Sequence, residues 1–175
     1  MRSAQEMIPI EEAVCADAEE ILALQRRAYQ SEAAIYDDYS LPPLLETLEE
    51  IRSRFGDHLF LKAVMEGRIV GSVRAREGDR VCHVSRLIVS PEIQNRRLGT
   101  RLMREVEARF PGARRFELFT GHKSERNLHL YRKLGYRIWK TEFVHERLDL
   151  VYLAKTLPRL SVGCERAVGA VYPQE

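Results

Sequence analysis

A tyrosine and an asparagine one helical turn apart are the residues of this chain best suited to acid–base chemistry. Asn127 and Tyr131 stand in the segment S-E-R-N-L-H-L-Y-R-K-L-G-Y, in which Ser124 is expected to cap a short helix that ends near Leu134. Residues four apart on a helix share a face, so both side chains are expected to reach one ligand. A phenol, with an ordinary pKa of about 10, can protonate a leaving group of similar basicity. The alternative is a half-buried aromatic residue between a helix and a sheet.

The loop P-E-I-Q-N-R-R-L-G, which precedes a second predicted helix, has the composition of an anion-binding site. The first backbone N–H groups of a helix lack partners within it, and the helix dipole adds about half a positive charge there. A glycine permits close approach, an asparagine tolerates a left-handed conformation, and arginines add charge. A glycine at a helix start is also often needed for packing alone. The residues predicted to surround a phosphate group are Gln94, Asn95, Arg96, Arg97, Leu98, Gly99 and Thr100.

Strands and one helix must position these two motifs. Segments rich in Val, Leu and Ile, separated by E-G-R and E-G-D-R turns, predict antiparallel strands at residues 59–65, 69–75 and 81–89. Apolar residues then recur every four positions from Leu98 to Phe110, which predicts a helix. A strand at 115–120 follows, and the strand–helix–strand order favours parallel pairing with the strand at 81–89 through a right-handed crossover.

The rest of the chain adds elements on both sides of this unit. A short strand is expected at residues 7–11, helices at 17–31 and 44–55, and further strands at 136–143 and 148–157. The sequence therefore predicts an α/β (α+β) fold with a mixed, mostly antiparallel central sheet flanked by helices.

Length and composition indicate one globular domain at residues 1–157, followed by a tail or extra strand at 158–175 that can also form a homodimer contact. No run approaches the roughly 18 apolar residues of a membrane span, and no secretory signal is evident, so a cytoplasmic location is expected. The net charge of +2 is too small to indicate a nucleic-acid partner. Cys15, Cys82 and Cys164 lack the spacing of a metal site or a disulfide framework.

Taken together, the motifs resemble those of the GNAT superfamily of N-acetyltransferases. The segment V-S-P-E-I-Q-N-R-R-L-G-T-R-L-M is similar to the family's acetyl-CoA-binding signature, Gln/Arg-x-x-Gly-x-Gly/Ala, with Arg97 in place of the first glycine. The segment L-Y-R-K-L-G-Y is similar to the family's closing motif, Leu-Tyr-x-Lys-x-Gly-Phe/Tyr. The resemblance covers roughly residues 64–136 and implies a GNAT-type fold in which a splayed parallel strand pair binds CoA.

The resemblance also implies a reaction and residue roles. Acetyl-CoA would donate its acetyl group to a primary amine, in a small molecule or at a peptide end, by direct attack in a ternary complex. Backbone groups matching Leu87 and Val89 hold the pantetheine arm and polarise the acetyl carbonyl in this family. The family tyrosine that protonates the departing thiolate matches Tyr131, and Asn127 is placed to bond the cofactor arm. Many members carry an asparagine at the position of Ser124.

The general base is not defined by the resemblance, because Ser85 stands where members often carry a glutamate. His83 lies two residues earlier on the same face of the strand and has a suitable ordinary pKa of about 6.5, which makes it the candidate base. A purely structural histidine is the alternative. Glu32, Asp37 and Asp38 can attract a cationic amine or form a solvated acidic loop.

Two other functions remain open from the sequence. A non-catalytic CoA-binding regulatory module is suggested by Ser85 and Arg97, whereas Tyr131 argues against it. An acetyltransferase for amino acids or peptide N-termini is the other alternative to an enzyme for small metabolite amines. The acceptor is expected to bind outside the two motifs, around residues 32–39.

Overall fold

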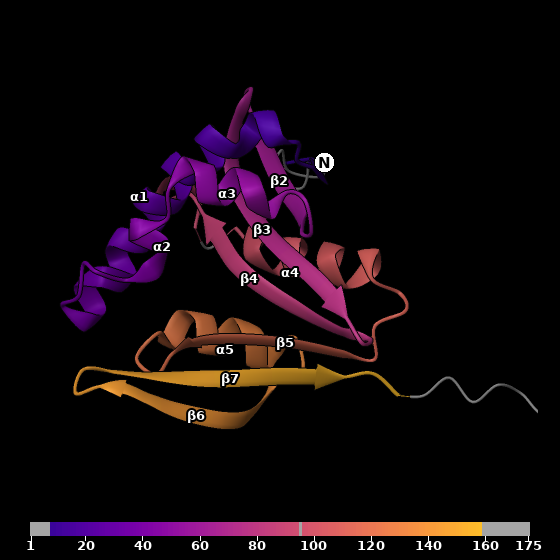
Figure 1. Cartoon of the computed structure of the whole chain (residues 1–175). Coiled ribbons are helices and arrows are strands. Elements are labelled where there is room, and N and C mark those ends of the chain that lie inside the picture. Colours follow the sequence, from indigo (N-terminus) through magenta and orange to yellow (C-terminus); the bar gives the residue numbers. More distant parts are fainter. Residues whose placement is uncertain (1–7, 95, 159–175) are drawn as a thin grey trace, which may run out of the picture.

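A seven-stranded sheet forms the centre of the molecule, with the strand order β1-β2-β3-β4-β5-β7-β6 (Figure 1). The computed structural model describes residues 8–94 and 96–158, so Asn95, Cys164 and nearly all of the segment 158–175 lie outside the described residues. The strands are β1 (Ile10–Glu12), β2 (Leu59–Met65), β3 (Arg68–Gly78), β4 (Val81–Val89), β5 (Arg115–Gly121), β6 (Arg137–His145) and β7 (Leu148–Thr156).

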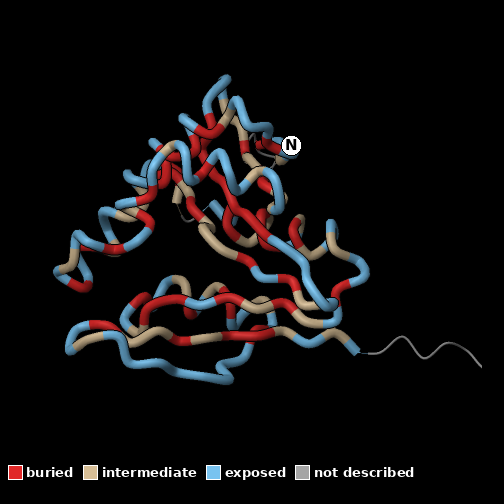
Figure 2. Tube along the Cα trace, in the orientation of Figure 1, coloured by how far each residue is buried: buried red, intermediate tan, exposed pale blue. Residues whose placement is uncertain are grey.

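Helices cover both faces of the sheet. In Figure 1, α3 lies in front of the sheet and α4 and α5 lie behind it. One apolar cluster joins α1 and α3 to the sheet, and a larger one joins the opposite face to α4 and α5. The edge strand β6 is exposed almost throughout (Figure 2). The helices are α1 (Ala18–Tyr36), α2 (Pro42–Leu45), α3 (Leu48–Arg54), α4 (Leu98–Arg109) and α5 (Glu125–Lys133), with short 3-10 turns η2 (Cys15–Asp17) and η3 (Pro91–Ile93).

The fold class predicted from the sequence is confirmed, and the first helix is longer than expected. α1 continues to Tyr36 instead of ending near Ser31. Ala33 and Tyr36 are buried against Leu148 of β7, and this tertiary packing holds the last turns in the helix. Asp37, with a φ of 47°, then ends it in a left-handed conformation.

The predicted helix at 44–55 is instead two short helices, α2 and α3. Thr47 begins α3 with a capping box, in which its Oγ1 accepts a hydrogen bond from the Glu50 backbone N–H at 3.2 Å. The Glu50 carboxylate accepts one from the Thr47 backbone N–H at 2.7 Å. The break between the helices places Glu46 at a non-helical position, from which its side chain reaches the interior.

β4 and β5 form the predicted parallel pair, and they separate after a short paired stretch. Their register joins only three residue pairs, the last of which is His83 with Glu117. Figure 1 shows the two strands meeting at one end and diverging toward the other. Backbone groups on the facing edges of the separated halves are therefore left without sheet partners.

β4 also contains a β-bulge where it faces β3. Arg74 lies opposite Ser85 and Ser72 lies opposite Ile88, so β4 has one residue more than β3 across this stretch. Arg86, within the bulge, has a φ of 53°. No helix among the described residues is long and apolar enough to cross a membrane.

Candidate active site

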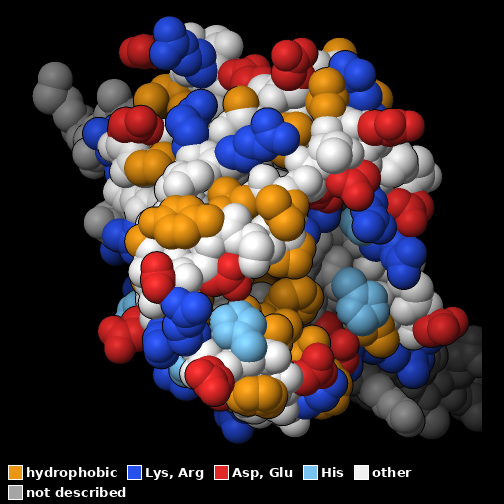
Figure 3. Space-filling model, turned by 60° about the vertical axis from the view of Figure 1, so that its left-hand side comes forward, with side chains coloured by type: hydrophobic (Ala, Val, Ile, Leu, Met, Phe, Trp, Pro, Cys, Tyr) orange, Lys and Arg blue, Asp and Glu red, His pale blue; other side chains and the backbone are white. Residues whose placement is uncertain are grey.

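A cavity of about 600 Å³ occupies the space where β4 and β5 diverge. Its walls come from α1, α2, the end of β4, the start of α4, the end of β5, α5 and the β6–β7 hairpin. On the face shown in Figure 3, hydrophobic side chains line a hollow bordered by charged and histidine side chains. The volume is in the range of cofactor and small-molecule sites.

The start of α4 forms one wall of this cavity. Arg97 occupies the N-cap position with a φ of 58°, and the helix has neither a side-chain cap nor an acidic residue in its first turn. The first amide groups of α4 are therefore available to an anion. The predicted loop residues that line the cavity are Gln94, Arg97, Leu98, Gly99 and Thr100. Arg96 is exposed and is not among the lining residues, and Asn95 is not described.

Gly99 is also needed for packing between α4 and α5. A Cβ atom at this position would lie 3.0 Å from Leu130 Cδ1 and within van der Waals distance of Leu87 and Val89. The packing role considered from the sequence is thus seen in the structure, and anion binding by this loop stays a prediction. Gln94 holds the loop, because its side-chain amide donates to the Val89 carbonyl at 3.5 Å and its Oε1 accepts from Arg126.

The backbone of Leu87 and Val89 faces the divergent edge of β4. The Ser90 N–H donates to the Val70 carbonyl at 2.8 Å, which fixes Ser90 as a position whose backbone points to β3. Alternation along the strand then turns the backbone groups of Leu87 and Val89 toward β5, where the ladder has ended. The structure places both residues on the cavity wall.

Tyr131 and Asn127 come together in the cavity from adjacent turns of α5. The Tyr131 side chain is buried, with 7% of the residue exposed, and its hydroxyl has no hydrogen-bond partner among the described residues. Burial raises the pKa of Tyr131 well above the ordinary value, with smaller contributions from Tyr29 and Glu32. Asn127 donates through Nδ2 to Thr120 Oγ1 at 3.3 Å, which ties α5 to β5.

His83 does not lie in the cavity, contrary to its expected place beside the reacting groups. Its side chain is exposed, with Nδ1 at 3.8 Å from Glu117 Oε2, and it stands at the last paired position of β4 and β5. The cavity opens only beyond this position, where the strands separate. Ser85 lines the cavity two residues later, and its Oγ accepts a hydrogen bond from Arg74 Nε at 3.3 Å.

Glu32 is the carboxylate that the structure brings to the cavity. The sequence predicted that the Ser124 side chain caps α5, but it makes no capping hydrogen bond. Its Oγ instead donates to Glu32 Oε2 at 2.5 Å. The Tyr36 hydroxyl lies 2.9 Å from the same Ser124 Oγ. It also accepts a hydrogen bond of 2.9 Å from the backbone N–H of Lys123. The end of α1 is thereby fixed over the start of α5.

Asp37 and Asp38, unlike Glu32, form contacts with the β6–β7 hairpin and do not line the cavity. Arg147 donates to Asp37 Oδ2 at 2.6 Å, and His145 Nε2 lies 3.2 Å from Asp38 Oδ2. Both contacts join the end of α1 to the β6–β7 hairpin, and neither aspartate lines the cavity.

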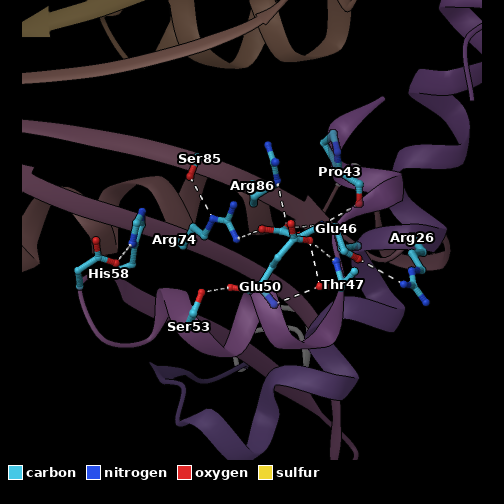
Figure 4. Close-up of polar contacts among 12 residues, drawn as sticks. Arg26, Pro43, Glu46, Thr47, Glu50, Ser53, His58, Arg74, Ser85 and Arg86 are labelled. Atoms are coloured by element: carbon cyan, nitrogen blue, oxygen red, sulfur yellow. Dashed lines mark hydrogen bonds and ion pairs between the residues drawn. The ribbon is translucent and has the colours of Figure 1, made fainter. Parts of the chain in front are cut away.

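A buried polar cluster beneath the cavity was not anticipated from the sequence. We call it the Glu46 cluster, and Figure 4 shows the Glu46 carboxylate pointing toward Arg74 and Arg86. Arg86 is also among the cavity-lining residues. A charged residue inside the apolar run V-S-R-L-I-V was the available signal. The members of the Glu46 cluster are Gln25, Glu46, Arg74 and Arg86.

The two described cysteines, Cys15 and Cys82, are not among the residues that line the cavity. Cys82 is buried, which raises the pKa of its thiol to about 12, and Cys15 is exposed and far from the cavity lining. Among the described residues no group of three or more His, Cys, Asp or Glu side chains is arranged to hold a metal ion.

Comparisons with known proteins agree with this geometry. A comparison with curated protein sequences gives no match. Among solved structures, PaiA N-acetyltransferase from Thermoplasma acidophilum in complex with coenzyme A aligns with a TM-score of 0.73 at 18% identity, over 86% of this chain and 99% of that one. The ribosomal-protein-S18-alanine N-acetyltransferase from Escherichia coli aligns with a TM-score of 0.75 at 15% identity, over 90% and 99% of the two chains.

A third structure and the sequence profile complete the comparison. A GNAT superfamily phosphinothricin acetyltransferase from Sinorhizobium meliloti, in complex with AcCoA, aligns with a TM-score of 0.70 at 22% identity, over 86% of this chain and 89% of that one. At these identities the structural matches establish the fold. The profile of the Acetyltransferase (GNAT) family matches residues 18–136, which include both motifs and most of the cavity lining. The chain therefore belongs to the GNAT acetyltransferase family.

Proposed function

We propose that this protein is an N-acetyltransferase that transfers the acetyl group of acetyl-CoA to a primary amine. One observation carries the proposal: the unbonded Tyr131 hydroxyl and the Glu32 carboxylate share a cavity that opens where β4 and β5 separate. Two structures of the same fold, from Thermoplasma acidophilum and Sinorhizobium meliloti, contain coenzyme A or AcCoA. Family membership supports the same donor here.

The residues at the start of α4 suit the pyrophosphate of the donor. The uncapped amides of Leu98, Gly99 and Thr100 would accept an anion at the positive end of the helix dipole, with Arg97 adding a cation. The freed backbone groups of Leu87 and Val89 would replace lost sheet bonds by bonding the pantetheine arm and the acetyl carbonyl. Asn127 stands on the same wall as a further donor to that arm.

Proton transfers complete the chemistry. In our proposal Glu32 binds the acceptor ammonium and removes one proton, which frees the nitrogen lone pair to attack the thioester carbon. A carbon–nitrogen bond forms, the carbon–sulfur bond breaks, and Tyr131 gives its proton to the departing sulfur. The second proton of the amine returns to Tyr131 as the amide forms. The Tyr131 hydroxyl is protonated in the resting site, and the burial that raises its pKa also raises the basicity of a thiolate formed beside it, so proton transfer between the two stays matched.

Thiol release from acetyl-CoA across a panel of amines tests the proposal. The panel includes polyamines, amino acids and peptides, and a reaction without amine corrects for hydrolysis. We expect saturable, amine-dependent release of CoA thiol and a matching acetylated amine by mass spectrometry. Saturable binding of acetyl-CoA without turnover of any amine would instead identify a regulatory module, the alternative suggested by Arg97 and Ser85.

A further inference from the structure

The bulge in β4 turns Arg86 toward the helices α1 and α2. In a regular strand, Arg86 would share the face of Val84, which belongs to the apolar cluster beneath α4 and α5. Instead, its Nε lies 3.6 Å from Glu46 Oε2 on the opposite face, and its φ of 53° is left-handed. A residue other than glycine keeps this conformation only where its surroundings impose it, and such positions concentrate at functional sites.

The Glu46 cluster contains more positive than negative charge. Glu46 accepts hydrogen bonds from Arg74 Nη1 at 2.9 Å and from Gln25 Nε2 at 2.8 Å, so both of its oxygens have partners closer than Arg86. The Arg86 Nε is buried and has no hydrogen-bond partner among the described residues. Two guanidinium groups thus share one carboxylate, and the Glu46 cluster by itself carries an excess of one positive charge.

The excess positive charge of the Glu46 cluster faces the cavity through Arg86. Arg86 is a lining residue and its side chain keeps 18% exposure, whereas Arg74 and Glu46 do not line the cavity. Figure 4 shows the Arg86 side chain extending away from α3. The other basic residues of the lining come from the α4 loop and α5, and they are Arg97, Arg126 and Lys133. Arg86 is therefore the basic residue that lines the cavity on the side formed by α1 and α2.

Glu32 and Arg86 lie near the same phenol. Burial raises the pKa of Tyr29, the positive charge of Arg86 and a hydrogen bond from it oppose this rise, and the negative charge of Glu32 adds to it. Tyr29 and both charged residues line the cavity. The α1 side of the cavity thus presents a carboxylate and a guanidinium.

We infer that the acceptor is an amine that also carries a carboxylate, as a free amino acid does, and that Arg86 binds this carboxylate. The inference rests on the proposed acetyl transfer and names its substrate class. The planar guanidinium of Arg86 matches a carboxylate in geometry as well as in charge, and its outer edge can donate two parallel hydrogen bonds while Nε stays buried against Glu46. Glu32 would hold the ammonium of the same molecule, so each charged end of the substrate meets a side chain of opposite charge.

Matched acceptors measure the contribution of the carboxylate. Each amino acid is compared with its carboxamide and with the amine that lacks the carboxyl group, by kcat/KM for CoA release. We expect the wild-type protein to prefer the carboxylate by about 10²-fold, because a polar site left unpaired rejects the smaller analogue. In Arg86→Gln this preference should disappear through a higher KM, with the Kd of acetyl-CoA unchanged.

A measurement of thermal stability distinguishes a role of Arg86 in substrate binding from a role in holding the fold together. Arg86→Gln leaves one guanidinium with one carboxylate, so its Tm without ligand should equal or exceed that of the wild type. The matched control is Arg76→Gln on β3, which removes an exposed arginine outside the cavity and should leave the acceptor preference intact. A large fall in the Tm of Arg86→Gln, with the preference for carboxylates retained, would overturn the inference.

A binding measurement distinguishes failure of this inference from failure of the proposed reaction. Calorimetry follows an N-acetylated amino acid binding to the protein saturated with CoA, and Arg86→Gln should weaken it about 10-fold or more. Efficient acetylation of amines without any preference for a carboxylate would retain the acetyltransferase and refute the role of Arg86. Arg86-dependent binding without turnover would retain the role of Arg86 and refute the acetyltransferase. Absence of both binding and turnover would refute the two proposals together.

Discussion

At the scale of single residues, Tyr131 is the side chain whose loss should affect chemistry without affecting structure. Its hydroxyl has no partner among the described residues, so Tyr131→Phe removes no internal hydrogen bond. We expect kcat to fall by about 10- to 10³-fold with acetyl-CoA affinity nearly unchanged, as steady-state kinetics and calorimetry would show. Unchanged turnover would remove Tyr131 from the role of acid.

Glu32 is the residue whose replacement should change the pH dependence of turnover. Glu32→Gln keeps an oxygen that accepts from Ser124 but loses the base, so kcat/KM should fall by about 10²- to 10⁴-fold at neutral pH. The loss should shrink as pH rises, because more of the amine is already deprotonated. pH profiles of both proteins test this, with Glu19→Gln on the exposed side of α1 as the matched control. Parallel profiles would exclude Glu32 as the base.

At the scale of elements, the end of α1 depends on a glycine in β5. A Cβ atom at Gly121 would overlap the Tyr36 ring and hydroxyl, so Gly121→Ala must displace the contact with Ser124. We expect a loss of about 1–3 kcal/mol in the free energy of unfolding, measured with urea. In a Tyr36→Leu background the same change should cost much less. Gly78→Ala, where a Cβ meets nothing within 4 Å, is the matched control.

Elements were predicted from the sequence where local patterns determine them. The strands β2, β3 and β4 and the helix α4 follow from apolar periodicity and turn residues. The length of α1 depends on burial of Tyr36 against β7, and the bulge in β4 depends on pairing with β3, so neither can be read from local sequence. For the same reason the cavity-lining residues at the start of α4 were predicted from the sequence, whereas Arg86 and Glu46 were not.

The position of His83 shows a second limit of sequence reasoning. Its place on the same strand face as Ser85 was a sound inference from alternation. Whether that face opens onto a cavity depends on where β4 and β5 separate, and they separate just beyond His83. The relative position of Tyr131 and Asn127 was easier to predict, because residues four apart on one helix always lie on the same face.

At the scale of the whole molecule, Glu46 couples α1, the α2–α3 break and β3. Burial by itself would raise the pKa of Glu46, but the hydrogen bond from Gln25 and the charge of Arg74 outweigh it and hold the pKa below 4.5. Its contribution to stability is therefore complete above pH 4.5 and is lost as pH falls through the lowered pKa of the folded state.

Glu46→Gln should consequently lower the free energy of unfolding at neutral pH. It should also make that free energy depend less on pH in the acid range. Removing the carboxylate leaves Arg74 and Arg86 without a counter-ion, and we expect a cost of about 3 kcal/mol at pH 7. Urea unfolding of both proteins between pH 3 and 7 tests this, and the two curves should converge at the acid end. A constant difference across this range would contradict the assignment. Glu49→Gln, an exposed position on α3, is the control.

With the role proposed for Arg86, the extra residue in β4 would make acceptor selection sensitive to the length of the strand as well as to its side chains. Deleting one residue at the bulge would restore strict alternation without altering the turns at either end of β4. The guanidinium of Arg86 would then be lost or would face the α4 side, while the sheet order stayed the same. Within such a fold, a single codon insertion or deletion is therefore a route by which a descendant protein can acquire a different class of amine.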